Sequence, residues 1–308
     1  MYDVVIIGAG PAGLTAAIYA ARKNLSTLVL SSDIGGQVEL TGDVENYPGF
    51  TFLTGPDLIK KFQEHVKKYN VELDSRVVVR EIIRDTNSFI IKTNSRTHEA
   101  KSIIIASRRI KRELNVPGEK ELQNKGVSCM LRYDLNTFKN RDVAVIGAGN
   151  SAMNVVFQLV PIADRIYVIN CTDRPNADEI SLNRIKDHPK VLIMNNTIAS
   201  EIRGKDWVEK IIIKHADSNK EEALDVQGIF VEIGYVASTD FLKGLIHMNE
   251  KDEIIIDIHN STNVPGIFAA GDVTNVLEKQ IIVACGEGAK AALSAYEYLK
   301  KNDLIIRE

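Results

Sequence analysis

The chain has 308 residues, and at roughly 150 residues per domain this length predicts about two domains. Hydrophobic residues make up 44% and charged residues 26%, which excludes a disordered chain, and a net charge of −3 argues against nucleic-acid binding. The three cysteines, Cys129, Cys171 and Cys285, include no CxxC pair, which argues against a disulfide framework and a structural zinc site. The apolar runs are too short to span a bilayer and the first residues lack a secretory pattern, so we expect a cytoplasmic protein without membrane contact.

The first thirty residues have the pattern of a dinucleotide-binding unit. A β-branched run at 2–7 predicts a buried strand, and a GxGxxG turn, an Ala-rich helix and a second strand at 26–31 follow it. Gly8 permits the tight turn, Gly10 lets the backbone approach a pyrophosphate, and Gly13 allows close packing of helix on strand. The helix N-terminus then offers free N–H groups to the phosphates. A tight turn without a ligand seldom needs all three glycines.

The same pattern recurs in the middle of the chain. Residues 142–146 predict a strand, 147–152 read GxGxxA, 153–160 predict a helix, and 165–169 predict the next strand. Two such units indicate either two dinucleotide sites or one functional site and one relic.

Further residues near these turns suit a dinucleotide ligand. The first unit has Ser31 and Ser32, not an acid, at the expected end of its second strand, so we expect a hydroxyl or the backbone to contact the ribose. The glycines of 35–37 allow close backbone approach. Near the C-terminus, Asp272 follows a short apolar strand and Gly271, where its carboxylate can accept hydrogen bonds from a polyol; the alternative role, an N-cap, fits less well because the next helix begins later.

Several segments together carry a family resemblance over essentially the whole chain: 3–13, 35–37, 44–50, 115–119, 143–152, 267–272, 279–282 and 286–289. With them the chain resembles the low-molecular-weight thioredoxin reductases, which are class-II pyridine nucleotide-disulfide oxidoreductases. It is also similar to the C-terminal part of the flavoprotein subunit of alkyl hydroperoxide reductase.

The resemblance implies an α/β fold of two Rossmann-like, three-layer ββα domains, with the second inserted into the first. Residues 1–111 and 246–308 would form a discontinuous FAD-binding domain, and 112–245 an inserted NAD(P)-binding-like domain. A hinge near Leu114 and Leu242 would let the domains rotate. The resemblance also implies a homodimer.

It further implies site residues. Those for FAD would be Gly8, Gly10, Pro11, Ala12, Gly13, Ser31, Gly35, Gly36, Gln37, Thr41, Asn46, Ala106, Gly271, Asp272, Lys279, Gln280 and Ile281. Those for a nicotinamide nucleotide would be Gly147, Gly149, Asn150, Ser151, Ala152 and Asn170. No metal site is expected, because no histidines have a metal-binding spacing.

The sequence departs from the family at its redox-active cysteines. An ungapped alignment puts Met130 and Tyr133 at the two positions of the CxxC, with Asp134 at the position of the neighbouring acid and Cys129 alone beside them. Neither Met130 nor Tyr133 can form a thiolate, so exchange with a protein disulfide by the family's mechanism is not expected. Tyr133 would either cover the flavin or pack between the domains.

The expected nucleotide-specificity segment also departs from the family. NADP-dependent members have arginines that bind the 2′-phosphate, whereas 170–176 reads Asn-Cys-Thr-Asp-Arg-Pro-Asn. Asn170 could bond ribose hydroxyls weakly, so NADH is expected over NADPH, and the absence of any nicotinamide partner is an open alternative.

A basic run follows Ala106, where the family has Ala-Thr-Gly. Arg108, Arg109, Lys111 and Arg112 form either a solvated turn or a patch for an anionic ligand or an acidic electron carrier.

Three functions remain. The first is an FAD-dependent oxidoreductase that passes electrons from NADH or another donor to a small molecule or an electron-carrier protein other than thioredoxin. The second is a flavin-binding redox sensor or a repurposed or engineered scaffold. The third is a reductase for ferredoxin- or flavodoxin-type partners.

Overall fold

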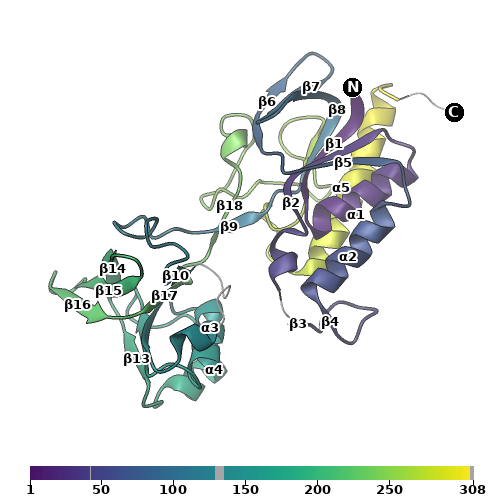
Figure 1. Cartoon of the computed structure of the whole chain (residues 1–308). Coiled ribbons are helices and arrows are strands. Elements are labelled where there is room, and N and C mark those ends of the chain that lie inside the picture. Colours follow the sequence, from purple (N-terminus) through teal and green to yellow (C-terminus); the bar gives the residue numbers. More distant parts are fainter. Residues whose placement is uncertain (42, 129–134, 306–308) are drawn as a thin grey trace. The chain divides into compact units, whose positions relative to one another are not determined.

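The computed structural model describes residues 1–41, 43–128 and 135–305. The chain forms two compact units, drawn in Figure 1: Met1–Ile110 with Val236–Glu308, here called the first unit, and Lys111–Tyr235, the inserted unit. The chain leaves the first unit within β9 (Arg109–Lys111) and returns to it within β18 (Tyr235–Ala237).

The return to the first unit comes ten residues earlier than the sequence predicted. Residues 236–245 pack with the first unit, because Ala237 and Leu242 are buried in the same apolar cluster as Val5 and Ile7. Leu242 is fully buried there, so it does not mark the second crossing point. The predicted boundary at 245/246 is therefore wrong, whereas the first boundary differs by one residue.

A mainly parallel sheet forms the centre of the first unit. Its strands run in the order β5-β2-β1-β8-β7-β6, and β19 also pairs with β8; only the pairs of β7 with β8 and of β6 with β7 are antiparallel. The strands are β1 (Tyr2–Ala9), β2 (Thr27–Ile34), β5 (Val71–Ser75), β6 (Val79–Arg84), β7 (Phe89–Thr93), β8 (Thr97–Ile105) and β19 (Ile267–Ala269), and a separate short pair is β3 (Asp43–Val44) with β4 (Leu53–Thr54). The helices are α1 (Pro11–Arg22), α2 (Gly55–Val66) and α5 (Ile281–Lys301), with 3₁₀ turns at Gly36–Leu40 and Asp240–Leu242.

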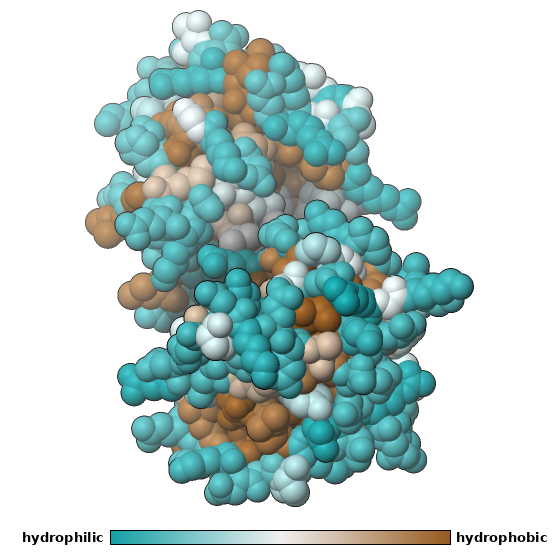
Figure 2. Space-filling model, turned by 90° about the vertical axis from the view of Figure 1, so that its left-hand side faces the viewer, coloured by the Kyte–Doolittle hydropathy of each residue, from teal (hydrophilic) through white to brown (hydrophobic). Residues whose placement is uncertain are grey.

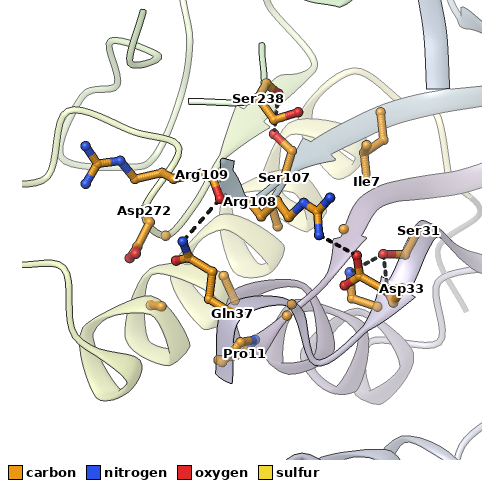
Figure 3. A pocket seen from close by; sticks show the side chains of 18 of the residues that line it. Ile7, Pro11, Ser31, Asp33, Gln37, Ser107, Arg108, Arg109, Ser238 and Asp272 are labelled. Carbon is orange, nitrogen blue, oxygen red and sulfur yellow. Dashed lines mark hydrogen bonds and ion pairs between the residues drawn. The ribbon is translucent and has the colours of Figure 1, made fainter. Parts of the chain in front are cut away.

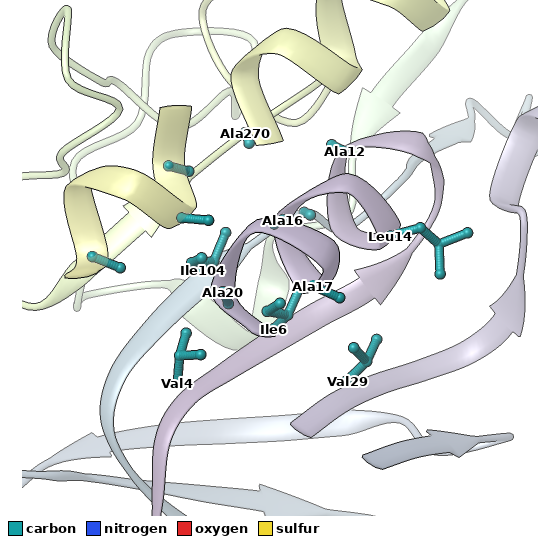
Figure 4. Close-up of a cluster of buried hydrophobic side chains, with 14 of the residues drawn as sticks. Val4, Ile6, Ala12, Leu14, Ala16, Ala17, Ala20, Val29, Ile104 and Ala270 are labelled. Atoms are coloured by element: carbon teal, nitrogen blue, oxygen red, sulfur yellow. The ribbon is translucent and has the colours of Figure 1, made fainter. Parts of the chain in front are cut away.

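Strand β1 is buried on both faces, which explains its continuous apolar sequence. Val4 and Ile6 point toward α1, where Figure 4 shows them with Leu14 and Ala17. The alternate residues, Val5 and Ile7, pack in a second cluster on the opposite face of the sheet. The predicted strand and helix around the glycine turn are both present, in the positions the periodicity indicated.

Helices α1 and α5 pack closely through small residues. Ala16 and Ala20 of α1 share a core with Ala292 and Ala295 of α5. A side chain at Gly288 would overlap the carbonyl oxygen of Ala12, so the two backbones nearly touch. This packing brings the N-terminus of α5 to the glycine turn that precedes α1.

The inserted unit repeats the strand-turn-helix arrangement on a parallel sheet of order β10-β17-β11-β12-β13, joined by an antiparallel sheet β14-β15-β16. The strands of the parallel sheet are β10 (Val127–Ser128), β11 (Asp142–Ile146), β12 (Arg165–Ile169), β13 (Val191–Met194) and β17 (Gly228–Val231). The antiparallel strands are β14 (Thr197–Gly204), β15 (Val208–His215) and β16 (Glu221–Asp225). The helices are α3 (Asn150–Leu159) and α4 (Glu179–Ile185), with a 3₁₀ turn at Leu135–Phe138.

Hydrophilic side chains predominate on the face drawn in Figure 2, broken by smaller apolar patches. Large exposed apolar residues such as Leu192 and Ile258 are few beside the buried cores. Over the residues that the structure describes, no helix combines the length and apolar character needed to cross a membrane.

Candidate functional site

The first glycine turn lies between β1 and α1, and its glycines have different roles. Gly8 has φ +115°, which L side chains rarely adopt, and a Cβ there would overlap the carbonyl oxygen of Ala106. A Cβ on Gly13 would overlap the carbonyl oxygen of Gly8, so close packing of α1 on β1 requires glycine. At Gly10 the nearest atom to a Cβ would be the Gly35 oxygen, 4.0 Å away. The backbone of Gly10 therefore remains approachable by a ligand.

A pocket of about 420 Å³ opens at this turn, within the first unit (Figure 3). Most residues predicted to bind FAD line it: Gly8, Gly10, Pro11, Ala12, Ser31, Gly36, Gln37, Thr41, Ala106, Gly271, Asp272, Lys279, Gln280 and Ile281. Segments far apart in the sequence thus meet at one cavity. The first turn of α1 has no side-chain cap, which leaves its N–H groups available to a ligand at the pocket.

Three of the predicted residues lie behind the pocket wall. Gly13 supports the packing of α1, and the Gly35 N–H donates to the Ala9 oxygen at 2.8 Å. Asn46 Nδ2 donates to Gln280 Oε1 at 3.1 Å. These residues shape the pocket or position its lining residues.

The end of β2 differs from the end that the sequence predicted. The strand continues to Ile34, so an acid, Asp33, lies next to its last residue and lines the pocket. Ser31 does not end the strand; its Oγ accepts from the Ala9 N–H at 3.1 Å and donates to the Asp33 oxygen at 2.5 Å. Arg108 Nη1 lies 2.9 Å from Asp33 Oδ2. The prediction that no acid stands at this strand end was wrong, because the apolar run stops before the strand does.

Charged groups gather at the Asp272 end of the pocket. Burial raises the pKa of the Asp272 carboxyl, and the nearby charges of Lys279 and Arg109 oppose this shift. Lys279 Nζ donates to the Asp272 main-chain oxygen at 3.2 Å and pairs with Glu253 at 3.2 Å. Gln37 Nε2 donates to the Arg109 oxygen at 3.2 Å and so joins the two sides of the pocket in Figure 3.

The N-terminus of α5 also faces the pocket, through Gln280 and Ile281. The helix has 21 residues and no side-chain cap at Gln280. The positive end of its dipole therefore faces the cavity and favours negative charge there.

Several further lining residues were not predicted from the sequence. They are Ser32, Asp33, Val77, Val78, Val79, Ser107, Arg108, Arg109, Ser238 and Phe241. Most come from segments without a recognisable motif; the basic run was the one signal, and its first two members belong to the pocket wall.

The inserted unit has a second glycine turn of similar geometry. Gly147 has φ +108°, and a Cβ there would overlap the carbonyl oxygen of Glu232. Ala152 is fully buried in α3, whereas Ser151 is exposed at the start of that helix. Asn150 Oδ1 accepts from the Asp178 N–H at 2.8 Å, which ties the segment after β12 to the turn.

Asn170 and Asn176 differ in their availability to a ligand. Asn170 is only 5% exposed, and its Nδ2 donates to the Thr172 oxygen at 3.1 Å and to Asn195 Oδ1 at 2.8 Å. Its amide is thus engaged within the protein. Asn176 is more open, and its Oδ1 would lie 3.3 Å from a Cβ on Gly149. The residue nearer the glycine turn is therefore Asn176, which was not predicted from the sequence.

Two charges of the basic run have partners in their own units. Arg108 pairs with Asp33, and Lys111 forms a largely buried ion pair with Glu232. Burial raises the pKa of Glu232, although the Lys111 charge and hydrogen bond oppose this. The run is therefore not a uniformly solvated patch.

Met130, Tyr133, Asp134 and Cys129 lie outside the described residues. Cys171 is exposed in the inserted unit, and Cys285 is buried in the first. Burial raises the pKa of the Cys285 thiol, and the Tyr47 hydroxyl donates to its sulfur at 3.7 Å. Residues 1–41, 43–128 and 135–305 contain no group of three or more His, Cys, Asp or Glu that could hold a metal ion.

Residues 2–288 match the family model described as pyridine nucleotide-disulphide oxidoreductase. The chain belongs to this family. It is 38% identical to a Ferdinandcohnia aciditolerans protein named NADH dehydrogenase over 98% of its own length and 58% of that protein. It is also 38% identical to the F protein of the Staphylococcus aureus alkyl hydroperoxide reductase, over 98% of this chain and 60% of that protein. It therefore spans about 60% of these curated relatives.

The solved structure of Lactococcus lactis thioredoxin reductase is similar along the whole chain. The TM-score is 0.87 at 35% identity, and the match covers 98% of this chain and 100% of that one. The predicted α/β architecture of Rossmann-like units is thereby confirmed. This member of the pyridine nucleotide-disulphide oxidoreductases is a thioredoxin reductase-like protein of an enzyme family.

Members of this family bind FAD and use NAD(P)H, and the first-unit pocket fits FAD. Gly10 and the uncapped N-terminus of α1 suit a pyrophosphate, while Asp272 offers a carboxylate to a polyol. The N-terminus of α5 suits a ring system on which negative charge develops.

Proposed function

We propose that the first unit binds FAD and that the inserted unit binds NADH, making the protein an NADH-dependent flavin oxidoreductase. The observation that carries the proposal is the single pocket that joins the Gly8–Gly13 turn, Asp272 and the N-terminus of α5. FAD, when bound, would supply the centre that accepts a hydride and releases electrons to an acceptor.

This chain's residues would bind and orient the cofactor. The N–H groups at the start of α1 would hold the pyrophosphate, and Asp272 would accept hydrogen bonds from the ribityl chain. Lys279 is already held by Glu253 and by the Asp272 main-chain oxygen, so its charge is fixed beside the pocket. Asn46 would orient Gln280 through their hydrogen bond.

The acceptor would be a small molecule or an electron-carrier protein other than thioredoxin. The sequence has three cysteines and no CxxC pair, so no two neighbouring thiols can alternate between the flavin and a partner disulfide. Cys285 is buried with a raised pKa, and Cys171 belongs to the other unit. Neither replaces the missing dithiol.

NADH is favoured over NADPH because the segment after β12 offers little positive charge. Asn170, Cys171 and Thr172 stand where arginines would bind a 2′-phosphate, and Arg174 is the one arginine of 170–176. A relative that covers 98% of this chain carries the name NADH dehydrogenase. We also expect a homodimer, as in thioredoxin reductases, which light scattering would test.

The first test is anaerobic mixing of FAD-reconstituted protein with NADH or NADPH. Flavin absorbance should bleach with NADH at a concentration at least about tenfold lower than with NADPH, since a lost charge-assisted contact to a phosphate is worth about that factor. Bleaching by neither would leave the sensor or the ferredoxin-type reductase as the function. Steady NADPH-dependent reduction of thioredoxin would contradict the proposal.

A matched variant pair locates the donor site. Gly147→Ala would drive a methyl group into the Glu232 carbonyl, so NADH bleaching should be lost while dithionite still bleaches the flavin. Gly234→Ala is the control in the same unit, because Gly234 also has a positive φ (+92°) but nothing within 4 Å of its Cβ position. Equal NADH bleaching in both variants would contradict a nucleotide site at Gly147.

A further inference from the structure

Residues 107–109 form a fixed segment along the wall of the first-unit pocket. Ser107 Oγ donates to the Ser238 oxygen at 3.0 Å, and the Ser238 N–H donates to the Arg108 oxygen at 3.0 Å. These two bonds hold the main chain on both sides of the Arg108 side chain. Its guanidinium therefore extends from a defined anchor, as Figure 3 shows.

The partner of Arg108 is equally fixed. Arg108 Nη1 lies 2.9 Å from Asp33 Oδ2, which also accepts from Ser32 Oγ at 3.1 Å. The Asp33 main-chain oxygen accepts from Ser31 Oγ at 2.5 Å. Asp33 and Arg108 both line the pocket, one from the end of β2 and the other beyond the end of β8.

The exposure of this pair indicates a role other than stability. The two side chains are 49% and 40% exposed, and ion pairs as open to solvent as this stabilise a fold only weakly. Yet the hydrogen bonds from Ser31, Ser32, Ser107 and Ser238 hold its two ends in place. Such anchoring is expected where a pair must present its polar atoms to a ligand in a defined geometry.

We propose that Arg108 and Asp33 together recognise the adenosine monophosphate half of the cofactor. A carboxylate at the second strand end of a βαβ unit accepts hydrogen bonds from ribose hydroxyls, and a guanidinium donates to ribose or phosphate oxygens. Arg108 fixes the Asp33 carboxylate and adds donors beside it. The inference rests on the proposed binding of FAD in this pocket, and it assigns the first arginine of the basic run to cofactor retention instead of partner docking.

The test compares ligands that contain or lack the adenosine half. In Arg108→Ala, the Kd for FAD and for ADP should rise about tenfold, the size expected for loss of hydrogen bonds to a charged group, while the Kd for FMN stays unchanged. Flavin fluorescence quenching measures FAD and FMN, and calorimetry measures ADP. Arg108→Lys keeps the charge but not the planar fork, and should give an intermediate loss.

Two controls separate the pair from general effects. Arg84→Ala removes an exposed arginine of the same unit that does not line the pocket, and should change none of the three constants. The melting temperature without cofactor should match the wild type in every variant. Asp33→Asn and the double variant with Arg108→Ala should show a non-additive loss of FAD affinity, because the residues act as a unit.

Several outcomes would overturn the inference. Unchanged FAD and ADP affinity in Arg108→Ala, an equal loss for FMN, or strictly additive effects would each do so. A wild-type protein that binds neither FAD nor FMN nor ADP would instead overturn the proposed function along with it.

Discussion

Lys279 Nζ lies 3.2 Å from Glu253 Oε1, and both side chains are largely buried beside Asp272. Lys279 Nζ also donates to the main-chain oxygens of Asp272 and Thr274, at 3.2 and 2.5 Å. Asn249 Nδ2 donates to the second Glu253 oxygen at 2.8 Å. Glu253 therefore fixes a positive charge at one end of the pocket.

Glu253→Gln should lower the free energy of unfolding at pH 7 by about 2 kcal/mol, because Lys279 would remain buried without its counter-charge. Urea denaturation of the cofactor-free protein measures this. Glu250→Gln, an exposed acid three residues earlier, is the matched control and should change the free energy by less than about 0.5 kcal/mol.

The stability difference should also depend on pH. Burial raises the pKa of Glu253, but the hydrogen bonds from Asn249 and Lys279 outweigh it, and the net pKa lies below its ordinary value of 4.5. A carboxyl whose pKa is lowered by folding stabilises above its unfolded pKa, and this stabilisation is lost as the pH falls through the folded pKa. The gap between wild type and Glu253→Gln should therefore shrink below about pH 4.5. A constant gap down to about pH 3 would contradict the assignment.

Asp272→Asn should separate binding from stability. Burial is the main cause of the raised Asp272 pKa, so the charged carboxylate is disfavoured in the folded, cofactor-free protein. For a raised acid pKa, stability is lost as the pH rises from the ordinary pKa of 3.8 through the folded pKa. The variant should therefore be as stable as the wild type or more so at pH 7, yet bind FAD more weakly. Thermal denaturation without FAD and an FAD titration check both parts; a less stable cofactor-free variant would contradict this account.

The parts of the site that the sequence predicted depend on local backbone geometry. The turns at Gly8 and Gly147 need a positive φ or a close approach within a few residues, so glycine spacing reveals them. Asp33 was missed because β2 continues past its apolar run, through the pairing of Ser31 with Ser75 of β5. Only the partner strand shows where β2 ends.

The remaining differences come from long-range packing. Ser238 and Phe241 line the pocket although no motif surrounds them, and Leu242 packs against strands more than two hundred residues earlier in the chain. A single sequence does not show these contacts. The second domain boundary was misplaced for the same reason.

The glycines of the first turn should respond differently to alanine. In Gly10→Ala the new methyl group meets no atom closer than about 4 Å, so the fold should persist, but the methyl enters the pocket and should abolish tight FAD binding. In Gly13→Ala it would overlap the Gly8 carbonyl, and the free energy of unfolding should fall by about 2 kcal/mol or more.

Gly286→Ala is the control for both variants. Gly286 lies within α5, outside the pocket lining, with nothing within 4 Å of its Cβ position. Alanine there should raise the free energy of unfolding by about 0.5–1 kcal/mol and leave FAD binding unchanged. If Gly10→Ala bound FAD as tightly as Gly286→Ala, the backbone of Gly10 would not contact the cofactor.

Asn170→Asp tests whether an acid at this position favours NADH, as the sequence pattern alone indicates. The structure predicts another outcome, because Asn170 Nδ2 donates to the Thr172 oxygen and to Asn195 Oδ1. A buried carboxylate would face two acceptors, so the variant should lose about 2–3 kcal/mol of unfolding free energy and gain no NADH affinity. Asn176→Asp is the control: this residue is more open and lies beside the glycine turn, so its stability should match the wild type. Chemical denaturation and NADH titration decide, and a stable Asn170→Asp variant with tighter NADH binding would restore the simpler interpretation.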